Sequence, residues 1–399
     1  MPGAGTRVER LVRKYTDKLI AQGLCSKDAP PLMGGLDAEL FWNREDPDQG
    51  LLEEVVRGLN INTILLAQPA EPYRSILDWL ASRVEGEEGI IQPEDSETRT
   101  FLHDIPVTRK FEPDRIVAAL KRRKNVIVPG KGIVTFGIVS PEQAFIHFSS
   151  VCFSCFVKFF SDYREDHRKG RVAPAQKEAF LKGKEFYRKL IERALAHPLP
   201  EEGPYETKEK VLEAMIRTGK ATVECGMVDS FFGNISYLLG DTIFISQTTS
   251  SLDELQGCID ACPVDGSSSV AITASSEFSV HKEVLTQSGK RAILHGHPRF
   301  SVIVSMICDE EDCEFRGRCF THCPKERYAG DVPIVPGEAG RGPRCISTTL
   351  PPPLKKHRAA IVYGHGLFCT GKVGYREAFG NLVRIEAENF ERYMEMVGE

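Results

Sequence analysis

Residues 292–297 read Ala-Ile-Leu-His-Gly-His, an aliphatic run that ends on two histidines. A short apolar run of this kind predicts a buried β-strand. Because side chains alternate across a strand, His295 and His297 project from the same face. Two imidazoles on one face can bind a single metal ion. The stretch therefore predicts a sheet-based domain with a metal site where this strand ends.

A third histidine, His365, follows another β-branched run. It lies in Ile-Val-Tyr-Gly-His-Gly at residues 361–366, where the flanking glycines favour a tight turn. A catalytic zinc site has three protein ligands and one position left for substrate, so His295, His297 and His365 form a candidate ligand set. The alternative is that each histidine is an ordinary core or surface residue with satisfied hydrogen bonds.

A helix start is predicted within residues 273–278, Thr-Ala-Ser-Ser-Glu-Phe. Ser275 or Ser276 is expected to cap a helix that continues to Leu285. Backbone N–H groups at a helix start, with serine hydroxyls beside them, suit a phosphate group. Glu277 falls in the first turn near the same pocket. Its alternative role is that of a favourable charge at the helix dipole.

The composition describes an acidic protein of more than one domain. The 399 residues exceed one ordinary domain, and a net charge of -5 with a pI near 6.1 gives no basic surface for nucleic acid. No apolar run is expected to reach the roughly 20 residues that span a bilayer. Residues 1–22 are too charged for a signal peptide. We therefore expect a cytoplasmic protein that binds neither nucleic acid nor membrane.

Two related domains joined by a helical connector are predicted. The connector covers residues 166–205, which are charged and helix-prone and end in several prolines. It separates a first domain, residues 1–165, from a second domain, residues 206–399.

The second domain is predicted to begin with a helix and a hairpin. Apolar residues recur at helical spacing over residues 207–218. Two β-rich runs follow, residues 234–239 and 242–246, and the Gly-Asp pair between them is a hairpin signal.

An internal repeat relates the two domains. Residues 120–145 align without gaps to residues 354–379, and ten of the 26 positions are identical. The counterparts of the three histidines are Leu66, Gln68 and Lys131, which cannot rebuild the ligand set. The first domain is therefore interpreted as a degenerate copy with a structural or interface role. The alternative is that any two strand–turn–helix units share glycines.

Four motifs stand in a characteristic order: Gly233-Asn234, Ser275-Ser276-Glu277, His295-Gly296-His297 and Gly364-His365-Gly366. In this combination the sequence resembles the class II aldolase/adducin superfamily over about residues 205–397. The resemblance implies an α/β fold, an α/β/α sandwich around a largely antiparallel sheet. With the internal repeat, this class II aldolase-like fold would be duplicated.

The resemblance also implies a site and a reaction. The implied roles are zinc (or another divalent metal) ligands for His295, His297 and His365, acid/base for Glu277, and phosphate binding for Asn234, Ser275 and Ser276. The implied enzyme is a zinc-dependent lyase that cleaves or forms a carbon–carbon bond in a ketose phosphate or related hydroxy-ketone. It would act through a metal-stabilised enediolate. Glu277, near the metal, could move the proton at the reacting carbon if its pKa is raised.

Two alternatives keep the fold and change the activity. One is dehydration, epimerisation or decarboxylation of a sugar phosphate at the same metal site. The other is a non-catalytic, adducin-like interaction module. The family resemblance and the two domains per chain also predict a homo-oligomer, with a homodimer as one assembly.

The phosphate-binding part departs from the family pattern. A Thr-Gly pair usually follows the hairpin in this family. Here residues 246–251 read Ser-Gln-Thr-Thr-Ser-Ser, with Thr249 where glycine is expected. The departure bears on phosphate recognition and leaves the predicted metal ligands unchanged.

Four of the twelve cysteines cluster in the second domain. Cytoplasmic cysteines are rarely structural disulfides, and most are expected to be small buried residues. Cys308, Cys313, Cys319 and Cys323, however, predict a second metal site, a structural zinc ion or an iron–sulfur cluster. His322 is a possible substitute ligand. The alternative is a set of free or partly oxidised cysteines.

Overall fold

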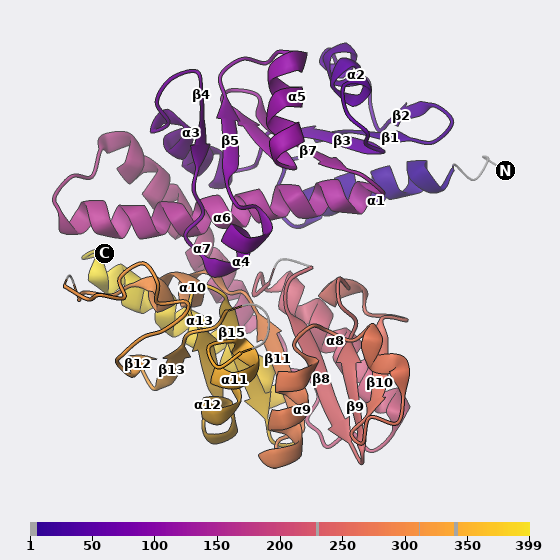
Figure 1. Ribbon diagram of the computed structural model, residues 1–399, viewed down its shortest axis with the longest axis vertical. Helices are drawn as coiled ribbons and strands as arrows, with labels where there is room; N and C mark the ends of the chain where they lie inside the picture. Colours follow the sequence, from indigo (N-terminus) through magenta and orange to yellow (C-terminus); the bar gives the residue numbers. More distant parts are fainter. Residues whose placement is uncertain (1–5, 229–230, 311, 339–341) are drawn as a thin grey trace. The chain divides into compact units, whose positions relative to one another are not determined.

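The computed structural model describes residues 6–228, 231–310, 312–338 and 342–399. The chain divides into two compact units, unit 1 (Met1–Phe186) and unit 2 (Tyr187–Glu399). Each unit contains one sheet with helices packed on it (Figure 1). The division falls inside α7 (Pro174–Ala196), the long helix of the predicted connector.

Unit 1 is a seven-stranded sheet between two layers of helices. Helices α1, α3 and α6 pack on one face, and α2 and α5 pack on the other. The helices are α1 (Arg7–Ala21), α2 (Gln49–Arg57), α3 (Tyr73–Ser82), α4 (Ser96–Phe101), α5 (Pro113–Arg122) and α6 (Pro141–Arg168). In sheet order the strands are β2 (Leu40–Trp42), β1 (Leu32–Leu36), β3 (Thr63–Ala67), β7 (Gly132–Gly137), β6 (Asn125–Val128), β5 (Ile105–Thr108) and β4 (Glu88–Ile91).

Unit 2 is an eight-stranded sheet covered in the same way. Helices α8, α10 and α13 lie on one face, and α9, α11 and α12 on the other. The helices are α8 (Lys208–Glu224), α9 (Phe278–Gln287), α10 (Arg299–Met306), α11 (Ile346–Thr349), α12 (Pro351–Lys356) and α13 (Tyr375–Met396). In sheet order the strands are β10 (Ile259–Pro263), β9 (Thr242–Ser246), β8 (Asn234–Leu239), β11 (Ala292–Gly296), β15 (Gly366–Gly371), β14 (Ala359–Val362), β13 (Val332–Val335) and β12 (Arg327–Ala329).

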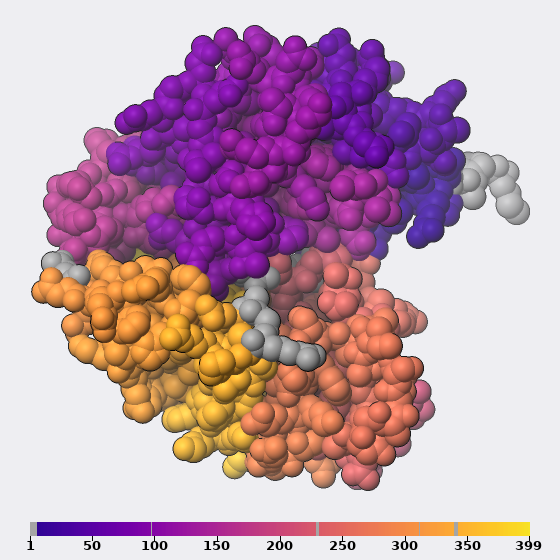
Figure 2. All heavy atoms as spheres, in the orientation of Figure 1, coloured from indigo at the N-terminus to yellow at the C-terminus, as the bar shows by residue number. Residues whose placement is uncertain are grey.

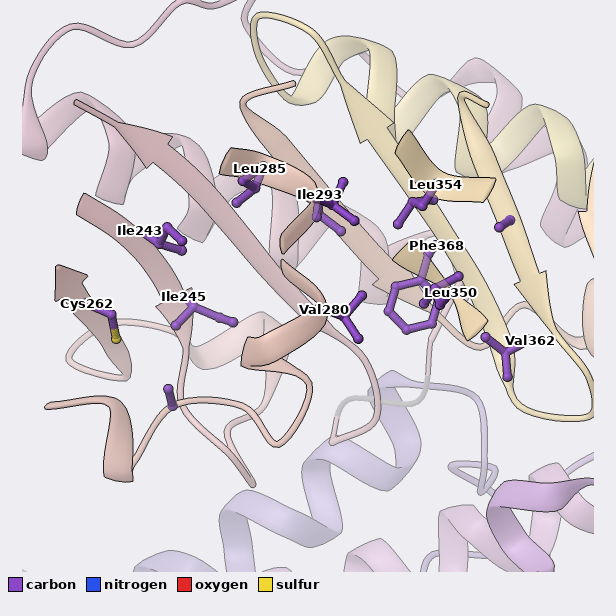
Figure 3. Close-up of a cluster of buried hydrophobic side chains, with 13 residues drawn as sticks. Ile243, Ile245, Cys262, Val280, Leu285, Ile293, Leu350, Leu354, Val362 and Phe368 are labelled. Atoms are coloured by element: carbon purple, nitrogen blue, oxygen red, sulfur yellow. The ribbon is translucent and has the colours of Figure 1, made fainter. Parts of the chain in front are cut away.

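The core of unit 2 positions the strand that carries two of the histidines. Ile293 of β11 and Phe368 of β15 are fully buried in an apolar cluster that includes side chains of α9 and α12 (Figure 3). His295 projects from the same face of β11 as Ile293, because the two residues are two positions apart. The predicted α/β/α sandwich around a largely antiparallel sheet is confirmed.

The two sheets have the same topology. Reading from β1 in unit 1 and β8 in unit 2, the strand orders are β1-β3-β7-β6-β5-β4 and β8-β11-β15-β14-β13-β12. Strand β5 pairs in parallel with β6, as β13 does with β14, and the other pairs among the described strands are antiparallel. The layers of helices correspond as well. This is the arrangement that duplication of one domain predicts.

In each unit, one glycine lies where two neighbouring strands approach each other closely. A Cβ atom added to Gly132 would lie 2.2 Å from the carbonyl oxygen of Ala67, at the end of β3. A Cβ atom added to Gly366 would lie 2.5 Å from the carbonyl oxygen of Gly296, at the end of β11. Since real Cβ contacts are not this short, both positions require glycine.

The strand register shows which residues of unit 1 lie at the positions of the three histidines of unit 2. Leu66 pairs with Val134 between β3 and β7, just as His295 pairs with Phe368 between β11 and β15. By this register, Leu66, Gln68 and Lys131 hold the positions that His295, His297 and His365 hold in unit 2. Lys131 instead forms an ion pair with Asp48, at 2.9 Å.

Helix α6 corrects one expectation about the sequence. By length and composition it is apolar enough to cross a membrane, with a mean hydropathy of 1.5 over its most apolar 18 residues. The expectation that no run is this long and apolar is wrong, because the phenylalanines, valines and cysteines of α6 outweigh its scattered serines. Of that window, 83% is buried inside the protein, as is typical of a core helix.

Low pH is expected to reduce the free energy of unfolding of unit 1, because His147 of α6 is buried in its neutral form. Burial lowers the pKa of His147 from 6.5 to about 4. A hydrogen bond between its Nδ1 and the Phe136 carbonyl, at 2.9 Å, acts in the opposite direction and raises the pKa, but by less. The unfolded chain therefore binds more protons between these values, so stability is full above pH 6.5 and falls as the pH drops toward 4. The loss approaches about 3 kcal/mol.

Urea unfolding at several pH values checks this expectation. Both tryptophans, Trp42 and Trp79, lie in unit 1, so their fluorescence reports the unfolding of that unit alone. The variant His147→Asn keeps a donor for Phe136 and does not titrate. Its unfolding free energy should change less between pH 7 and pH 5 than that of the unmodified protein. Equal slopes for the two proteins would contradict the assignment.

Candidate metal centre

The structure brings the three predicted histidines together. His295 is in β11, His297 follows that strand, and His365 lies in the turn between β14 and β15. Because β15 pairs with β11, this turn lies beside the end of β11. One ring nitrogen from each histidine lies within 4.8 Å of the others, and within the described ranges this is the one group of potential metal ligands so gathered.

The rings are oriented as ligands of one ion would be. Nδ1 of His295 lies 3.2 Å from the carbonyl oxygen of Leu367, so Nδ1–H donates there and Nε2 faces the site. Nε2 of His297 lies 3.0 Å from Nε2 of His295. Two nitrogen ligands of one tetrahedral zinc ion lie roughly 3.3 Å apart. The ring of His365 is parallel to that of His295, with centroids 5.1 Å apart.

The space for these rings depends on the glycine that starts β15. A Cβ atom added to Gly366 would lie 2.7 Å from Cε1 of His295 and 3.0 Å from Cδ2 of His297. The ring of Phe368 stacks on the ring of His295, with centroids 3.7 Å apart. Burial lowers the pKa of His295 to about 3, so its imidazole is neutral at pH 7, the form that binds a metal. The residues present therefore fit a metal ion.

Glu277 directs its carboxylate at the histidines. Its Oε1 lies 3.3 Å from Nε2 of His365, and its Oε2 lies 3.8 Å from Nε2 of His295. Burial raises the pKa of Glu277, but the two histidines and a hydrogen bond from Asn234 outweigh it and hold the pKa below its ordinary value. In this arrangement the pKa of Glu277 is therefore lowered and not raised. The carboxylate is ionised at pH 7 and can accept a proton.

Asn234 is placed by strand pairing. It lies opposite His295 in the antiparallel pair of β8 and β11, and its Nδ2 donates to Oε2 of Glu277, at 2.6 Å. Its Oδ1 is buried without a hydrogen-bond partner. In this structure the side chain of Asn234 orients the carboxylate. Its role in phosphate binding stays a prediction.

The predicted serine cap is wrong. Helix α9 begins at Phe278 with Glu277 at the N-cap, and no side chain caps it. The N–H of Ser275 donates to the carbonyl of Ser246, at 3.1 Å, and this bond holds Ser275 in the loop before the helix. Its hydroxyl accepts from the N–H of Glu277, at 3.4 Å. Ser275 is buried and Ser276 is exposed.

Thr249 adopts a backbone conformation that glycine favours. Its φ is +60°, in the left-handed region that is unusual for a β-branched residue. The loop has therefore kept the shape that glycine favours. Thr249 itself is exposed to solvent.

One contributor that sequence reasoning missed is Glu386 of α13. Its carboxylate accepts hydrogen bonds from the N–H groups of Phe300, at 2.6 Å, and Ser301, at 2.8 Å. The hydroxyl of Tyr187 donates to it, at 2.5 Å. These N–H groups lie in the first turn of α10, which starts two residues after His297. The buried carboxylate of Glu386 therefore stabilises the helix start that follows His297. The sequence signal was slight, a single glutamate on a helix face that is mostly apolar and also carries Asn389.

The turn that carries His365 is also tied to α10. The hydroxyl of Ser305 accepts a hydrogen bond from the N–H of Gly364, at 2.9 Å. One short helix thus supports both segments of the histidine set.

Comparison with known families agrees with this geometry. Residues 213–388 match the sequence model of the class II aldolase and adducin N-terminal domain. The second half of the chain carries a class II aldolase/adducin domain. No curated protein sequence matches the chain.

Solved structures similar to the aldolase/adducin domain include three bacterial proteins. L-fuculose-1-phosphate aldolase from Thermus thermophilus is 22% identical, with coverage of 46% of this chain and 93% of that chain and a TM-score of 0.36. YgbL from Escherichia coli, a suggested aldolase/epimerase/decarboxylase, is 20% identical, with coverage of 45% and 87% and a TM-score of 0.37. A sugar-phosphate aldolase from Thermotoga maritima is 17% identical, with coverage of 48% and 96% and a TM-score of 0.34.

The four predicted cysteines lie elsewhere in the aldolase/adducin domain. Cys308, Cys313, Cys319 and Cys323 line a cavity whose wall contains none of the three histidines. His322, the suggested substitute ligand, is not part of that wall. Its ring packs edge-on against Phe315, with centroids 4.7 Å apart.

Proposed function

We propose that the aldolase/adducin domain is a zinc-dependent lyase that cleaves or forms a carbon–carbon bond in a ketose phosphate or related hydroxy-ketone. One observation carries the proposal. Three histidine nitrogens lie within 4.8 Å of one another, and the carboxylate of Glu277 lies 3.3 Å from one of these rings. This arrangement offers a metal site and a proton acceptor side by side.

Each residue has a role in the proposed chemistry. His295, His297 and His365 would hold the ion, and the carbonyl of Leu367 fixes the orientation of His295. A zinc ion bound there supplies a Lewis acid for the negative charge that develops on substrate oxygens. Glu277 accepts or returns a proton at the reacting carbon, and Asn234 holds its carboxylate in place.

The proposed substrate carries a phosphate near the start of α9. The N–H groups of that helix start, with Ser275, Ser276 and Asn234, are the proposed contacts. Unit 1, with Leu66, Gln68 and Lys131 at the equivalent positions, is proposed to be non-catalytic. The proposed assembly is a homodimer and the proposed location is the cytoplasm.

Activity should disappear when the metal is removed. Protein treated with a strong chelator and then dialysed is expected to release no aldehyde from a panel of ketose phosphates, because the remaining residues cannot stabilise charge on the substrate oxygens. Added zinc should restore aldehyde release. Unphosphorylated ketoses, assayed in parallel, test the phosphate contacts. Equal turnover by metal-free and zinc-loaded protein would overturn the proposal.

The products distinguish the alternative reactions. Loss of water, an epimer or carbon dioxide from the same panel would assign dehydration, epimerisation or decarboxylation to the site. Absence of turnover in fully zinc-loaded protein across the panel would favour an adducin-like interaction module.

A further inference from the structure

A long connection distinguishes unit 2 from unit 1. In unit 2, residues 307–326 join α10 to β12, which is 20 residues. In unit 1, residues 83–87 join the equivalent elements, α3 and β4, which is five residues. The described part of residues 307–326 contains turns but no helix or strand. The fold closes the same connection without these extra residues, so the longer loop is an elaboration of unit 2.

This loop carries four cysteines that share one cavity. Cys308, Cys313, Cys319 and Cys323 all line a cavity of about 700 Å³, and none of the four is in a disulfide. Cys319 is buried, and the other three are half-buried. Part of the loop reaches the surface, in orange, on the face that Figure 2 shows.

The four thiols influence one another electrostatically. Burial raises the pKa of Cys319, Arg327 lowers it, and the neighbouring thiols of Cys323, Cys308 and Cys313 raise it further. The four groups are therefore close enough to interact. Within the described residues, however, they do not gather as tightly as the histidine nitrogens, so a bound ion would have to draw them inward.

The described part of this loop is held by turns and by a few polar contacts. Its turns rest on short-range hydrogen bonds, such as Arg316 N–H to the Cys313 carbonyl, at 2.9 Å. Near its ends, Lys325 forms an ion pair with Glu310, at 2.6 Å, and the guanidinium of Arg327 donates to the carbonyl of Ile307, at 2.5 Å. Loops of this length without regular structure are uncommon in compact domains unless they have a function. A bound metal ion gives such a segment the free energy to order.

We propose that Cys308, Cys313, Cys319 and Cys323 bind one structural zinc ion, separate from the ion at the histidines. Four thiolates are a closed tetrahedral set for zinc, with sulfur atoms about 2.3 Å from the ion and no position left for substrate. A loop without helices or strands in its described part can move to bring the thiolates to this distance. Arg327, in the wall of the same cavity, lowers the pKa of Cys319 and so favours its thiolate. Lys325, in the same wall, forms an ion pair with Glu310, at 2.6 Å.

Zinc content per chain tests the site directly. Full-length protein purified anaerobically should contain two zinc ions. His295→Ala/His297→Ala should contain one, held by the cysteines. Cys313→Ser/Cys319→Ser should also contain one, held by the histidines. Cys258→Ser, a half-buried cysteine outside the cluster, is the matched control and should keep both.

Thiol protection gives a second measurement on the unmodified chain. Alkylation followed by mass spectrometry should leave the four cysteines unmodified until a chelator is added, whereas Cys258 should react at the same rate with and without it. Equal zinc content in the unmodified protein and the cysteine variant would overturn the proposal. So would chelator-independent alkylation of the four cysteines, or the absorption of an iron–sulfur cluster with stoichiometric iron and sulfide.

Discussion

Glu277→Gln is expected to lower turnover by a factor of about 100 to 10,000 while the protein keeps its zinc. Glutamine has nearly the same shape and can still accept a hydrogen bond from Asn234, but it cannot take up a proton. The three histidine ligands are untouched. Turnover on the substrate found by the screen, together with zinc content, checks the expectation.

Glu283→Gln is the matched control for this variant. Glu283 is on the same helix, α9, and forms an ion pair with Lys355, at 2.8 Å. Its replacement should leave turnover nearly unchanged. An unchanged rate in Glu277→Gln would assign proton transfer to another group, without contradicting the metal site.

His297→Ala is expected to abolish zinc binding at the histidine site and turnover with it. Loss of a hydrogen-bond partner of a metal ligand costs roughly 10–100-fold in metal affinity, and loss of the ligand itself should cost more. Zinc titration against a competing chelator measures this affinity. His357→Ala, a half-buried histidine outside the site, is the control and should bind zinc normally. Undiminished affinity in His297→Ala would remove this residue from the ligand set.

The fold of His297→Ala should remain intact. Unit 1 forms the same sheet with Leu66, Gln68 and Lys131 at the equivalent positions, so this topology does not need the histidines. Circular dichroism and thermal unfolding of the variant, close to those of metal-free unmodified protein, would separate lost binding from lost structure.

Local patterns in the sequence predicted the elements that form the site. The hairpin of β8 and β9 has the predicted bounds, because the turn signal and the flanking β-rich runs agree. Alternation along β11 places His295 and His297 on one face. The repeat between the two halves anticipated the shared topology, because half of its identities fall on β6, β7 and the turn between them, the counterparts of β14, β15 and their turn.

Other features depend on contacts between distant segments, which no local pattern shows. A serine at a helix start is usually a cap, yet Ser275 is held by Ser246, on the neighbouring strand. The carboxylate of Glu386 meets α10 across more than eighty residues of sequence. The pKa of Glu277 depends on which rings surround it, so its direction could be read only from the folded site.

The two units share one topology, but only unit 2 carries the three histidines. Identical residues at equivalent positions of the two units therefore show what this topology requires without a metal site. Gly137 and Gly371 illustrate this, since an added Cβ atom would lie 2.1 Å from the carbonyl of Ser140 in one copy and 2.0 Å from that of Gly374 in the other. At both positions the requirement for glycine comes from the close approach of the backbone alone, so it holds whether or not the unit carries the histidines.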